Sequence, residues 1–140
     1  MIPKYKPYLD FSEIKSLFNF DKNIIQKFEE DFARTVHSKY ALSFPYGRSG
    51  LFALLKSQGI QKAEILVPAY TCIVVPNAIV ASGNIPKFVD ISLDDYNIGL
   101  KDVSSSLSEG TRAIIPTHMY GYPMNVKQLR DTIDNNRILI

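Results

Sequence analysis

The sequence predicts a single α/β domain, or part of one, built around a mainly parallel β-sheet. Short apolar runs alternate with amphipathic stretches of roughly ten residues, which is the pattern of strands joined by crossover helices. Glycines stand directly after two of the helical stretches. A chain of 140 residues with 46% hydrophobic content is long enough to bury one ordinary core.

The N-terminal region differs from the rest of the chain. Residues 1–20 combine prolines with scattered aromatics, so we expect an extended arm with a short helical turn near 12–18. Asp21 is the expected N-cap of the helix that follows. Apolar residues recur at four-residue spacing along one face of that helix, namely Ile24, Phe28 and Phe32.

Repeated strand and helix units make up the remainder. The expected strands cover residues 41–44, 64–67, 87–89 and 113–116, and another strand starts at 137–140. The expected helices cover about 49–58, the stretch that ends near 82, 101–107 and 126–135. Gly59 and Gly83 are suited to end the first two of these helices in a left-handed conformation. The polar segment 92–97 reads as a turn.

Composition excludes several classes of function. The formal charge of +2 comes without a basic stripe, so we do not expect nucleic acid as a partner. No signal peptide and no apolar run of roughly 18 to 20 residues are present, which predicts a cytoplasmic protein without a membrane segment. Cys72 is the single cysteine, and the two histidines are not spaced around it as zinc ligands, so we expect neither a disulfide nor a metal site.

The stretch FPYGRSGLFALL runs from an apolar segment through a Gly-Arg-Ser-Gly corner into a helix. A helix N-terminus attracts anions through its free N–H groups and its dipole. We expect free amides at Arg48, Ser49 and Gly50, and the Ser49 hydroxyl adds another donor. The spacing is not that of a P-loop or of a dinucleotide fingerprint. The alternative is a tight turn in which Ser49 acts only as an N-cap.

Other candidate residues follow strands, where ligands of open α/β sheets bind. Tyr70 either stacks on a flat cofactor or covers the end of the sheet. Cys72 fits a small buried apolar residue better than a nucleophile, because neither histidine is near it in sequence. His118 either faces a substrate or bonds only locally. The acidic residues of the next loop favour turn chemistry over a metal site; they are Asp90, Asp94 and Asp95.

Four segments taken together carry a family resemblance: EEDFARTVHSKYALSF, GRSGLFALLKSQGI, EILVPAYTCIVVPNAIVASGNIPKFVDI and TRAIIPTHMYGYPMNV. In order and rough spacing they resemble the N-terminal half of the large domain of the DegT/DnrJ/EryC1/StrS aminotransferases. Members of this family are fold type I enzymes that use pyridoxal 5′-phosphate and mostly aminate nucleotide-linked keto sugars. The resemblance implies a mainly parallel sheet with helices on both faces. It implies an N-terminal arm over 1–20 and a partial cofactor-binding domain over 21–140.

The resemblance also implies roles for particular residues. The Ser-Gly-Thr of the family, which binds the cofactor phosphate, falls on Gly47, Arg48 and Ser49, with Arg48 in place of a glycine. Cys72 falls where a Phe or Trp commonly stacks on the pyridine ring, so stacking by Cys72 is poorer. Tyr70 is a further substrate-side candidate, and His118 matches a histidine at the rim of the site.

The acidic residue and the Schiff-base lysine that define the family's chemistry are expected beyond Ile140, so these 140 residues alone should be inactive. We therefore expect a truncated domain whose last strand is an open edge, and a chain that is marginally stable or aggregated when isolated. The amino donor is commonly glutamate in the family, and its members are homodimers. Two alternatives stay open: a non-catalytic doubly wound domain that binds a phosphorylated ligand, and a dehydrating or inactive relative.

Overall fold

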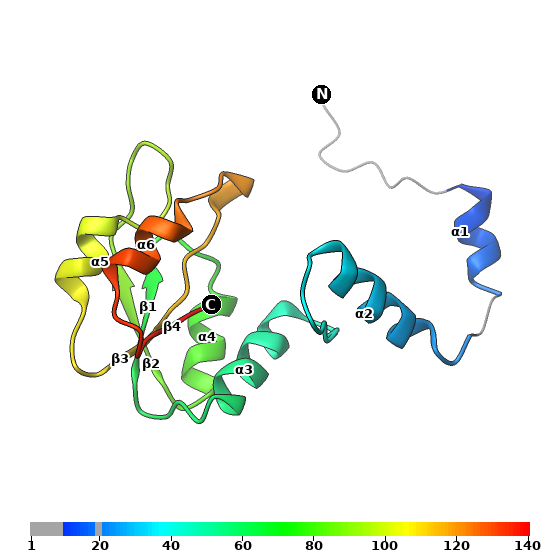
Figure 1. Ribbon diagram of the computed structural model, residues 1–140, viewed down its shortest axis with the longest axis horizontal. Coiled ribbons are helices and arrows are strands. Elements are labelled where there is room, and N and C mark those ends of the chain that lie inside the picture. Colours follow the sequence, from blue (N-terminus) through cyan, green and yellow to red (C-terminus); the bar gives the residue numbers. More distant parts are fainter. Residues whose placement is uncertain (1–9, 19–20) are drawn as a thin grey trace. The chain divides into compact units, whose positions relative to one another are not determined.

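The computed structural model describes residues 10–18 and 21–140 and divides the chain between Ser43 and Phe44 into two compact units (Figure 1). The first unit holds helices α1 (Phe11–Ser16) and α2 (Ile24–Thr35). A capping box begins α1, because the Asp10 carboxylate accepts the Ser12 N–H and the Glu13 carboxylate accepts the Asp10 N–H. The predicted helical turn is therefore present, one residue earlier than expected.

Helix α2 has the predicted four-residue apolar spacing, but its start was predicted wrongly. Asn23 stands at the N-cap, and the helix begins at Ile24. The Asp21 side chain instead accepts the Asn23 N–H at 2.9 Å and pairs with the Lys27 ammonium. Asp21 therefore shapes the turn before the helix and does not cap it.

The second unit contains a four-stranded parallel sheet in the order β2-β1-β3-β4. The strands are β1 (Glu64–Pro68), β2 (Ile85–Val89), β3 (Thr111–Ile114) and β4 (Ile138–Leu139). The helices are α3 (Gly47–Ser57), α4 (Val74–Ala81), α5 (Leu100–Ser106) and α6 (Val126–Thr132), with a short 3₁₀ turn, η1 (Met119–Gly121). This arrangement confirms the α/β class and the parallel sheet.

The strand predicted at residues 41–44 does not form. These residues pair with no other strand in the described part of the chain, and Leu42 and Phe44 are exposed. The Ser43 N–H donates to the Glu29 carboxylate at 2.6 Å, and that carboxylate also accepts the Ser43 hydroxyl. An apolar run becomes a strand only where a neighbouring backbone is available, so its sequence alone was a misleading signal.

Helices cover both faces of the sheet, as predicted (Figure 1). Along β1, Ile65 and Val67 point to one face and Leu66 to the other, because side chains alternate along a strand. The first face packs against Leu55 of α3 and Ile79 of α4. The second face packs against Val103 of α5 and Leu129 of α6, which belong to the same buried cluster as Leu66. Two separate apolar layers thus enclose the sheet.

Both glycine stops were predicted correctly. Gly59 and Gly83 have φ angles of +67° and +88°, in the left-handed region that ends a helix at low cost for glycine. Among residues 10–18 and 21–140, no helix combines the length and the apolar content needed to cross a bilayer.

A polar network lies at the amino ends of the strands. The Glu64 carboxylate accepts the Ser108 hydroxyl at 2.5 Å, the Lys87 ammonium at 3.0 Å and the Thr111 hydroxyl at 3.3 Å. These donors, with Ser108 first and Lys87 next, lower the pKa of Glu64 below its ordinary value. The network links β1 to β2 and to the segment that leads into β3.

We expect Leu55→Ala to destabilise the second unit by about 2–5 kcal/mol, because it leaves a cavity against β1. The adjacent Leu54 is a matched control: Leu54 is 38% exposed and Leu55 is 0% exposed. Leu54→Ala should cost on the order of 1 kcal/mol. Urea unfolding followed by circular dichroism measures both changes, and equal losses for the two variants would contradict the described packing.

We expect Glu64→Gln to reduce the loss of stability in acid. Because the folded-state pKa of Glu64 is lowered, its ionised form stabilises the fold above the ordinary pKa of about 4.5, and this contribution is lost as the pH falls below that value. The Tm of the variant should therefore vary less between about pH 3 and pH 5 than that of the parent chain. The exposed Glu109 provides a control, and Glu109→Gln should leave the slope unchanged. If the slope of Tm against pH were unaltered in Glu64→Gln, the Glu64 network would not contribute to the acid dependence of stability.

Candidate active site at the carboxyl edge of the sheet

Three loops meet at one edge of the sheet because all of its strands are parallel. The segments 69–73, 90–99 and 115–125 follow β1, β2 and β3 respectively. In open α/β sheets this carboxyl edge is where ligands bind. Each loop carries one tyrosine that reaches a shared cluster: Tyr70, Tyr96 and Tyr120.

The tyrosine cluster is held by ring contacts and one hydrogen bond. The Tyr70 ring centroid lies 6.2 Å from that of Tyr96 and 6.4 Å from that of Tyr120. The Tyr70 and Tyr120 hydroxyl oxygens are 2.6 Å apart. This bond to Tyr70 raises the pKa of the Tyr120 phenol. Sequence reasoning selected Tyr70 and missed the other two, although a tyrosine in each of three corresponding loops was a signal.

Two of the three tyrosines have unusual backbone conformations. Tyr96 and Tyr120 have φ angles of 59° and 53°, in the left-handed region that non-glycine residues seldom occupy. Gly121 follows with a φ of +80°. Such strain persists only where surrounding contacts enforce it, and it concentrates at binding and catalytic sites. The tyrosine cluster therefore lies at the edge of the sheet where ligands bind, and surrounding contacts enforce its backbone conformation.

The polar turn predicted at 92–97 is confirmed. The Ser92 N–H donates to the Asn97 carbonyl at 2.9 Å, and the Asp95 carboxylate accepts the Asn97 N–H at 3.0 Å. That backbone N–H is the main reason why the pKa of Asp95 is lowered. In the part of the chain that the structure describes, no three His, Cys, Asp or Glu side chains are grouped so that they could hold a metal ion.

His118 lies on the exposed side of the third loop. Its Nδ1 accepts the Met124 N–H at 3.1 Å, which gives it the local hydrogen bond that was one of the two expectations. An imidazole that accepts at Nδ1 carries its proton on Nε2 when neutral. Nε2 is the ring nitrogen that would meet a substrate, and that role stays a prediction.

The Gly-Arg-Ser-Gly corner forms the start of α3, two residues earlier than expected. Tyr46 is the N-cap, so the prediction of Ser49 as N-cap is wrong. The Ser49 and Gly50 amides donate to the Tyr46 carbonyl at 3.0 and 3.3 Å and are not free. The free amides of the first turn are those of Gly47 and Arg48, which have no carbonyl acceptor among the described residues.

The two glycines of the corner have different roles. A Cβ on Gly47 would meet nothing within 4 Å, so this side of the corner is open. A Cβ on Gly50 would lie 3.1 Å from the Phe44 ring, so Gly50 makes room for Phe44 and not for a ligand. Only Gly47 therefore fits the expected close approach of a ligand to the backbone.

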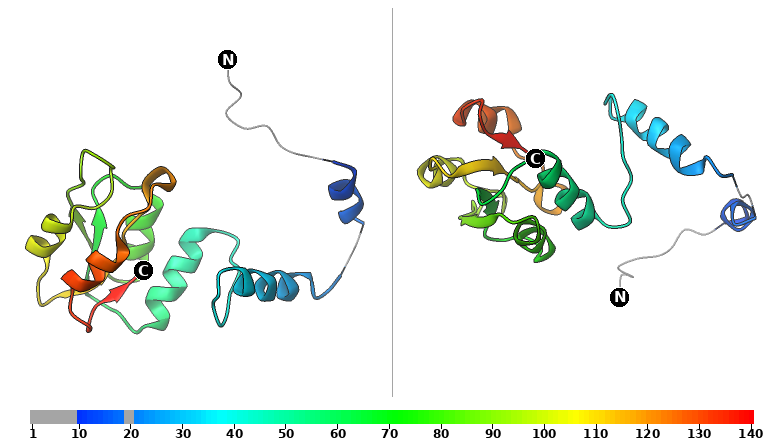
Figure 2. Two further views of the ribbon diagram at one scale, coloured as in Figure 1. Left: turned by 45° about the horizontal axis from the view of Figure 1, so that its top comes forward. Right: turned by 90° about the horizontal axis from the view of Figure 1, so that it is seen from below.

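Two cavities adjoin the start of α3, and Arg48 lines both. One, of about 390 Å³, is lined by Tyr46, Gly47, Arg48, Leu51, Val74 and Val75. The other, of about 330 Å³, is lined by Arg48, Ser49, Phe52, Asn77, Ala78 and Ala81. Helices α3 and α4 lie side by side (Figure 2), which explains why α4 residues line both cavities. The Arg48 guanidinium lies 4.6 Å over the Tyr46 ring.

These features fit a phosphate group. Two free amides, the positive end of the α3 dipole and the Arg48 guanidinium all favour an anion at this corner. Ser49 stands in the first turn of α3 and lines the second cavity, so its hydroxyl adds a donor. Cys72 is exposed, contrary to the expected buried position, and it lies just before α4 without lining either cavity. Its position on the cofactor ring stays a prediction.

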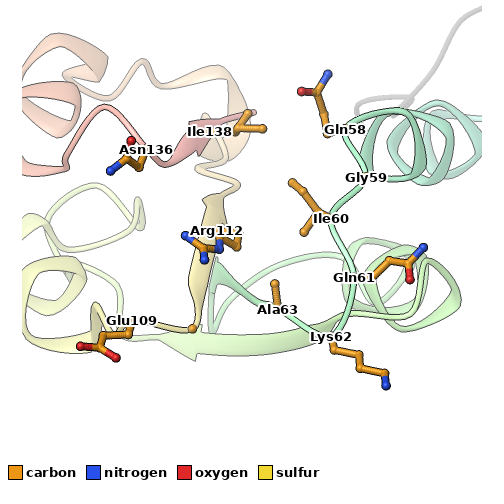
Figure 3. Close-up of a pocket in the computed structure, with 11 residues that line it drawn as sticks. Gln58, Gly59, Ile60, Gln61, Lys62, Ala63, Glu109, Arg112, Asn136 and Ile138 are labelled. Atoms are coloured by element: carbon orange, nitrogen blue, oxygen red, sulfur yellow. The ribbon is translucent and has the colours of Figure 1, made fainter.

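A further cavity, of about 470 Å³, lies at the opposite edge of the sheet (Figure 3). Its lining comes from residues 58–63, 109–112 and 136–138, which lead into β1, β3 and β4. Since none of the three carboxyl-edge loops contributes to it, this cavity is not part of the candidate site.

Comparisons with known proteins identify a family match for most of the chain. The model of the DegT/DnrJ/EryC1/StrS aminotransferase family matches residues 15–140. GDP-perosamine synthase from Vibrio cholerae is 30% identical and covers 100% of the chain, whereas the chain covers 41% of that relative. The chain therefore spans about two fifths of the length of this relative.

Solved structures show the same fold. An aminotransferase from Psychrobacter cryohalolentis superposes with a TM-score of 0.84 at 24% identity, over 96% of this chain and 38% of that one. GDP-4-keto-6-deoxymannose-3-dehydratase with a trapped PLP-glutamate geminal diamine superposes with a TM-score of 0.79 at 25% identity, over 92% of this chain and 36% of that one. The predicted fold type I architecture is confirmed by these neighbours.

We expect Gly121→Ala to destabilise the second unit by about 1–2 kcal/mol, because alanine is disfavoured at the φ of +80°. Gly110→Ala is the control, since a Cβ there would make ordinary contacts at 3.6–3.7 Å and Gly110 is not among the positive-φ glycines. Thermal unfolding of both variants measures the difference. A neutral Gly121→Ala would show that the left-handed turn is not required.

Proposed function

Because the chain belongs to the DegT/DnrJ/EryC1/StrS aminotransferase family, we propose that this protein uses pyridoxal 5′-phosphate to transfer an amino group to a keto sugar. Glutamate is the proposed amino donor, and the keto sugar is nucleotide-linked. The name of the relative from Vibrio cholerae supports the sugar product, and the PLP-glutamate adduct of the dehydratase supports the cofactor and the donor.

The observation that carries the proposal is the open corner at the start of α3. The Gly47 and Arg48 amides, the Arg48 guanidinium and the Ser49 hydroxyl would hold the 5′-phosphate of the cofactor. When bound, pyridoxal phosphate supplies the electron sink and carries the amino group. Contact with the Tyr46 ring restricts the Arg48 side chain, so the guanidinium would lose less freedom when it binds the anion.

The loops after β1 and β3 would serve the ring and the substrate. Cys72 would line one face of the ring, a role supported by its position just before α4, whose first turn lines the cavity at the corner. Tyr70 and His118 would contact the substrate, through a phenol hydroxyl and through Nε2. Both groups can donate hydrogen bonds to sugar hydroxyls or to a carbonyl oxygen.

The proposal extends to the organisation of the protein. By family resemblance, residues 1–20 would form an arm, residues 21–140 would form part of the cofactor-binding domain, and the working enzyme would be a cytoplasmic homodimer. Residues that complete the reaction, including the lysine that binds the cofactor, would lie outside the 140 residues.

Dehydration of a keto sugar is a second candidate. The dehydratase neighbour shares the fold at a TM-score of 0.79 and binds the same cofactor. The phosphate corner would serve either reaction equally well, because it anchors the cofactor and does not touch the reacting carbon. The residue at the position of the cofactor-binding lysine separates the two candidates.

We expect pyridoxine 5′-phosphate to shift the amide NMR signals of Gly47, Arg48 and Ser49. This probe has no aldehyde and so does not react with lysines, and pyridoxine without the phosphate should leave these signals in place. Arg48→Ala should weaken binding roughly tenfold, or about 1.4 kcal/mol, because a charge-assisted hydrogen bond is lost.

Lys56 provides the matched control, since it is a cation in the last turn of the same helix. Lys56→Ala should leave the affinity unchanged. Equal NMR shifts with pyridoxine and with its phosphate, or equal losses of affinity in Arg48→Ala and Lys56→Ala, would refute phosphate binding at the start of α3.

A further inference from the structure

Asn97 is a buried polar residue, only 2% exposed, at the end of the turn that follows β2. Its side-chain oxygen accepts the Met119 N–H at 3.0 Å. Its side-chain nitrogen donates to the Tyr122 carbonyl at 3.3 Å and to the Asp95 carboxylate at 3.1 Å. A single amide group thus joins two crossover loops that are more than twenty residues apart in sequence.

The bonds from Asn97 enclose the strained turn of the third loop. Met119 and Tyr122 stand on either side of Tyr120, whose φ is 53° and whose hydroxyl meets that of Tyr70 at 2.6 Å. Tyr96, the residue before Asn97, has its ring centroid 6.2 Å from that of Tyr70. Asn97 is therefore next to Tyr96 in sequence, and its side chain is hydrogen-bonded to the turn that carries Tyr120.

Apart from the contact between the Tyr70 and Tyr120 hydroxyls, the other hydrogen bonds of this turn are local. The Gly121 N–H donates to the His118 carbonyl at 3.1 Å, and the Tyr122 N–H donates to the Met119 carbonyl at 2.9 Å. Bonds within the segment give the turn its shape but cannot place it against a neighbouring loop. The bonds from Asn97 come from a different crossover, so they supply that placement.

We propose that Asn97 is a positioning residue that clamps the 119–122 turn to the 92–97 loop and thereby holds Tyr70, Tyr96 and Tyr120 together as one preformed aromatic surface for the substrate. The amide suits this task because it accepts and donates at once. The part of the inference that concerns the substrate rests on the proposed function. The clamp itself is a property of the chain without any ligand.

The decisive measurement is the set of NMR contacts between the Tyr70 and Tyr120 rings. Asn97→Ala should abolish these ring-to-ring NOEs while the NOEs of the apolar core, for example between Leu66 and Ile114, remain. Asn125→Ala is the matched control, since the Asn125 side chain accepts the Gln128 N–H at 3.0 Å and caps α6 in the same crossover. The control should leave the tyrosine contacts intact.

A second signature separates positioning from a general loss of stability. The bond to Tyr70 raises the pKa of Tyr120, so the Tyr120 phenol, followed by its Cζ chemical shift, should titrate at lower pH in Asn97→Ala than in the parent chain. The Asn125→Ala variant should titrate like the parent. Persistence of the NOEs in Asn97→Ala, or the same changes in both variants, would overturn the inference.

The parent chain alone offers a test if Asn97→Ala does not fold. The Met119 amide, bonded to Asn97, should exchange with solvent at least about tenfold more slowly than the Tyr120 amide, which has no acceptor within the described residues. Equal exchange rates would show that the clamp does not exist. None of these measurements uses a cofactor. The proposal for Asn97 can therefore be refuted while phosphate binding at the start of α3 is supported, and phosphate binding can be refuted while the proposal for Asn97 is supported.

Discussion

Parallel pairing of the central strand is the constraint on which the second unit depends. Strand β1 is hydrogen-bonded in parallel to β2 on one side and to β3 on the other. Parallel neighbours cannot be joined by a tight turn, so each connection crosses the sheet and carries a helix. Because both faces of β1 are apolar, those helices must cover both sides. The layers, the crossovers and the common edge of loops all follow from this pairing.

The same constraint separates the chemistry of the two edges. Each crossover helix runs back against the strands, so helices begin at the carboxyl edge and end at the amino edge. The start of α3 lies at the same edge, because it shares a cavity with the first turn of the crossover helix α4. At the amino edge, the Glu64 carboxylate accepts hydrogen bonds from Lys87 and Ser108 and so links β1 to β2 and to the segment before β3. Polar contacts connect the strands at the amino edge, whereas the carboxyl edge carries hydrogen-bond donors suited to an anion.

Asn97 and Glu64 have comparable roles at opposite ends of the sheet. Each connects segments that are distant in sequence through one side chain with several hydrogen bonds. For the buried Asn97 amide, such bonds favour a single arrangement, because a lost partner leaves a costly unsatisfied group. Asn97 has the added consequence that the loops it joins carry the tyrosine cluster. Local strain at Tyr120 can persist because the clamp comes from outside the turn.

The α/β class, the strands β1, β2, β3 and β4, and the glycine stops at Gly59 and Gly83 could be predicted from the amino-acid sequence. These features depend on hydrophobic period and on backbone conformations that act over a few residues. The corner at Gly47 was also visible, since a glycine-rich start of a helix is a local signal.

Features that need a partner from elsewhere in the chain could not be predicted in this way. Residues 41–44 are mostly apolar but pair with no strand among the residues that the structure describes, and Asn23 and Tyr46 occupy the N-cap positions predicted for Asp21 and Ser49. The roles of Tyr96, Tyr120 and Asn97 depend on loops brought together by the crossovers, and only the recurrence of tyrosine in these loops hinted at them in the sequence. Hydrogen bonds between distant loops depend on how the strands are ordered, and that order is set by packing over the whole sheet and not by any single segment.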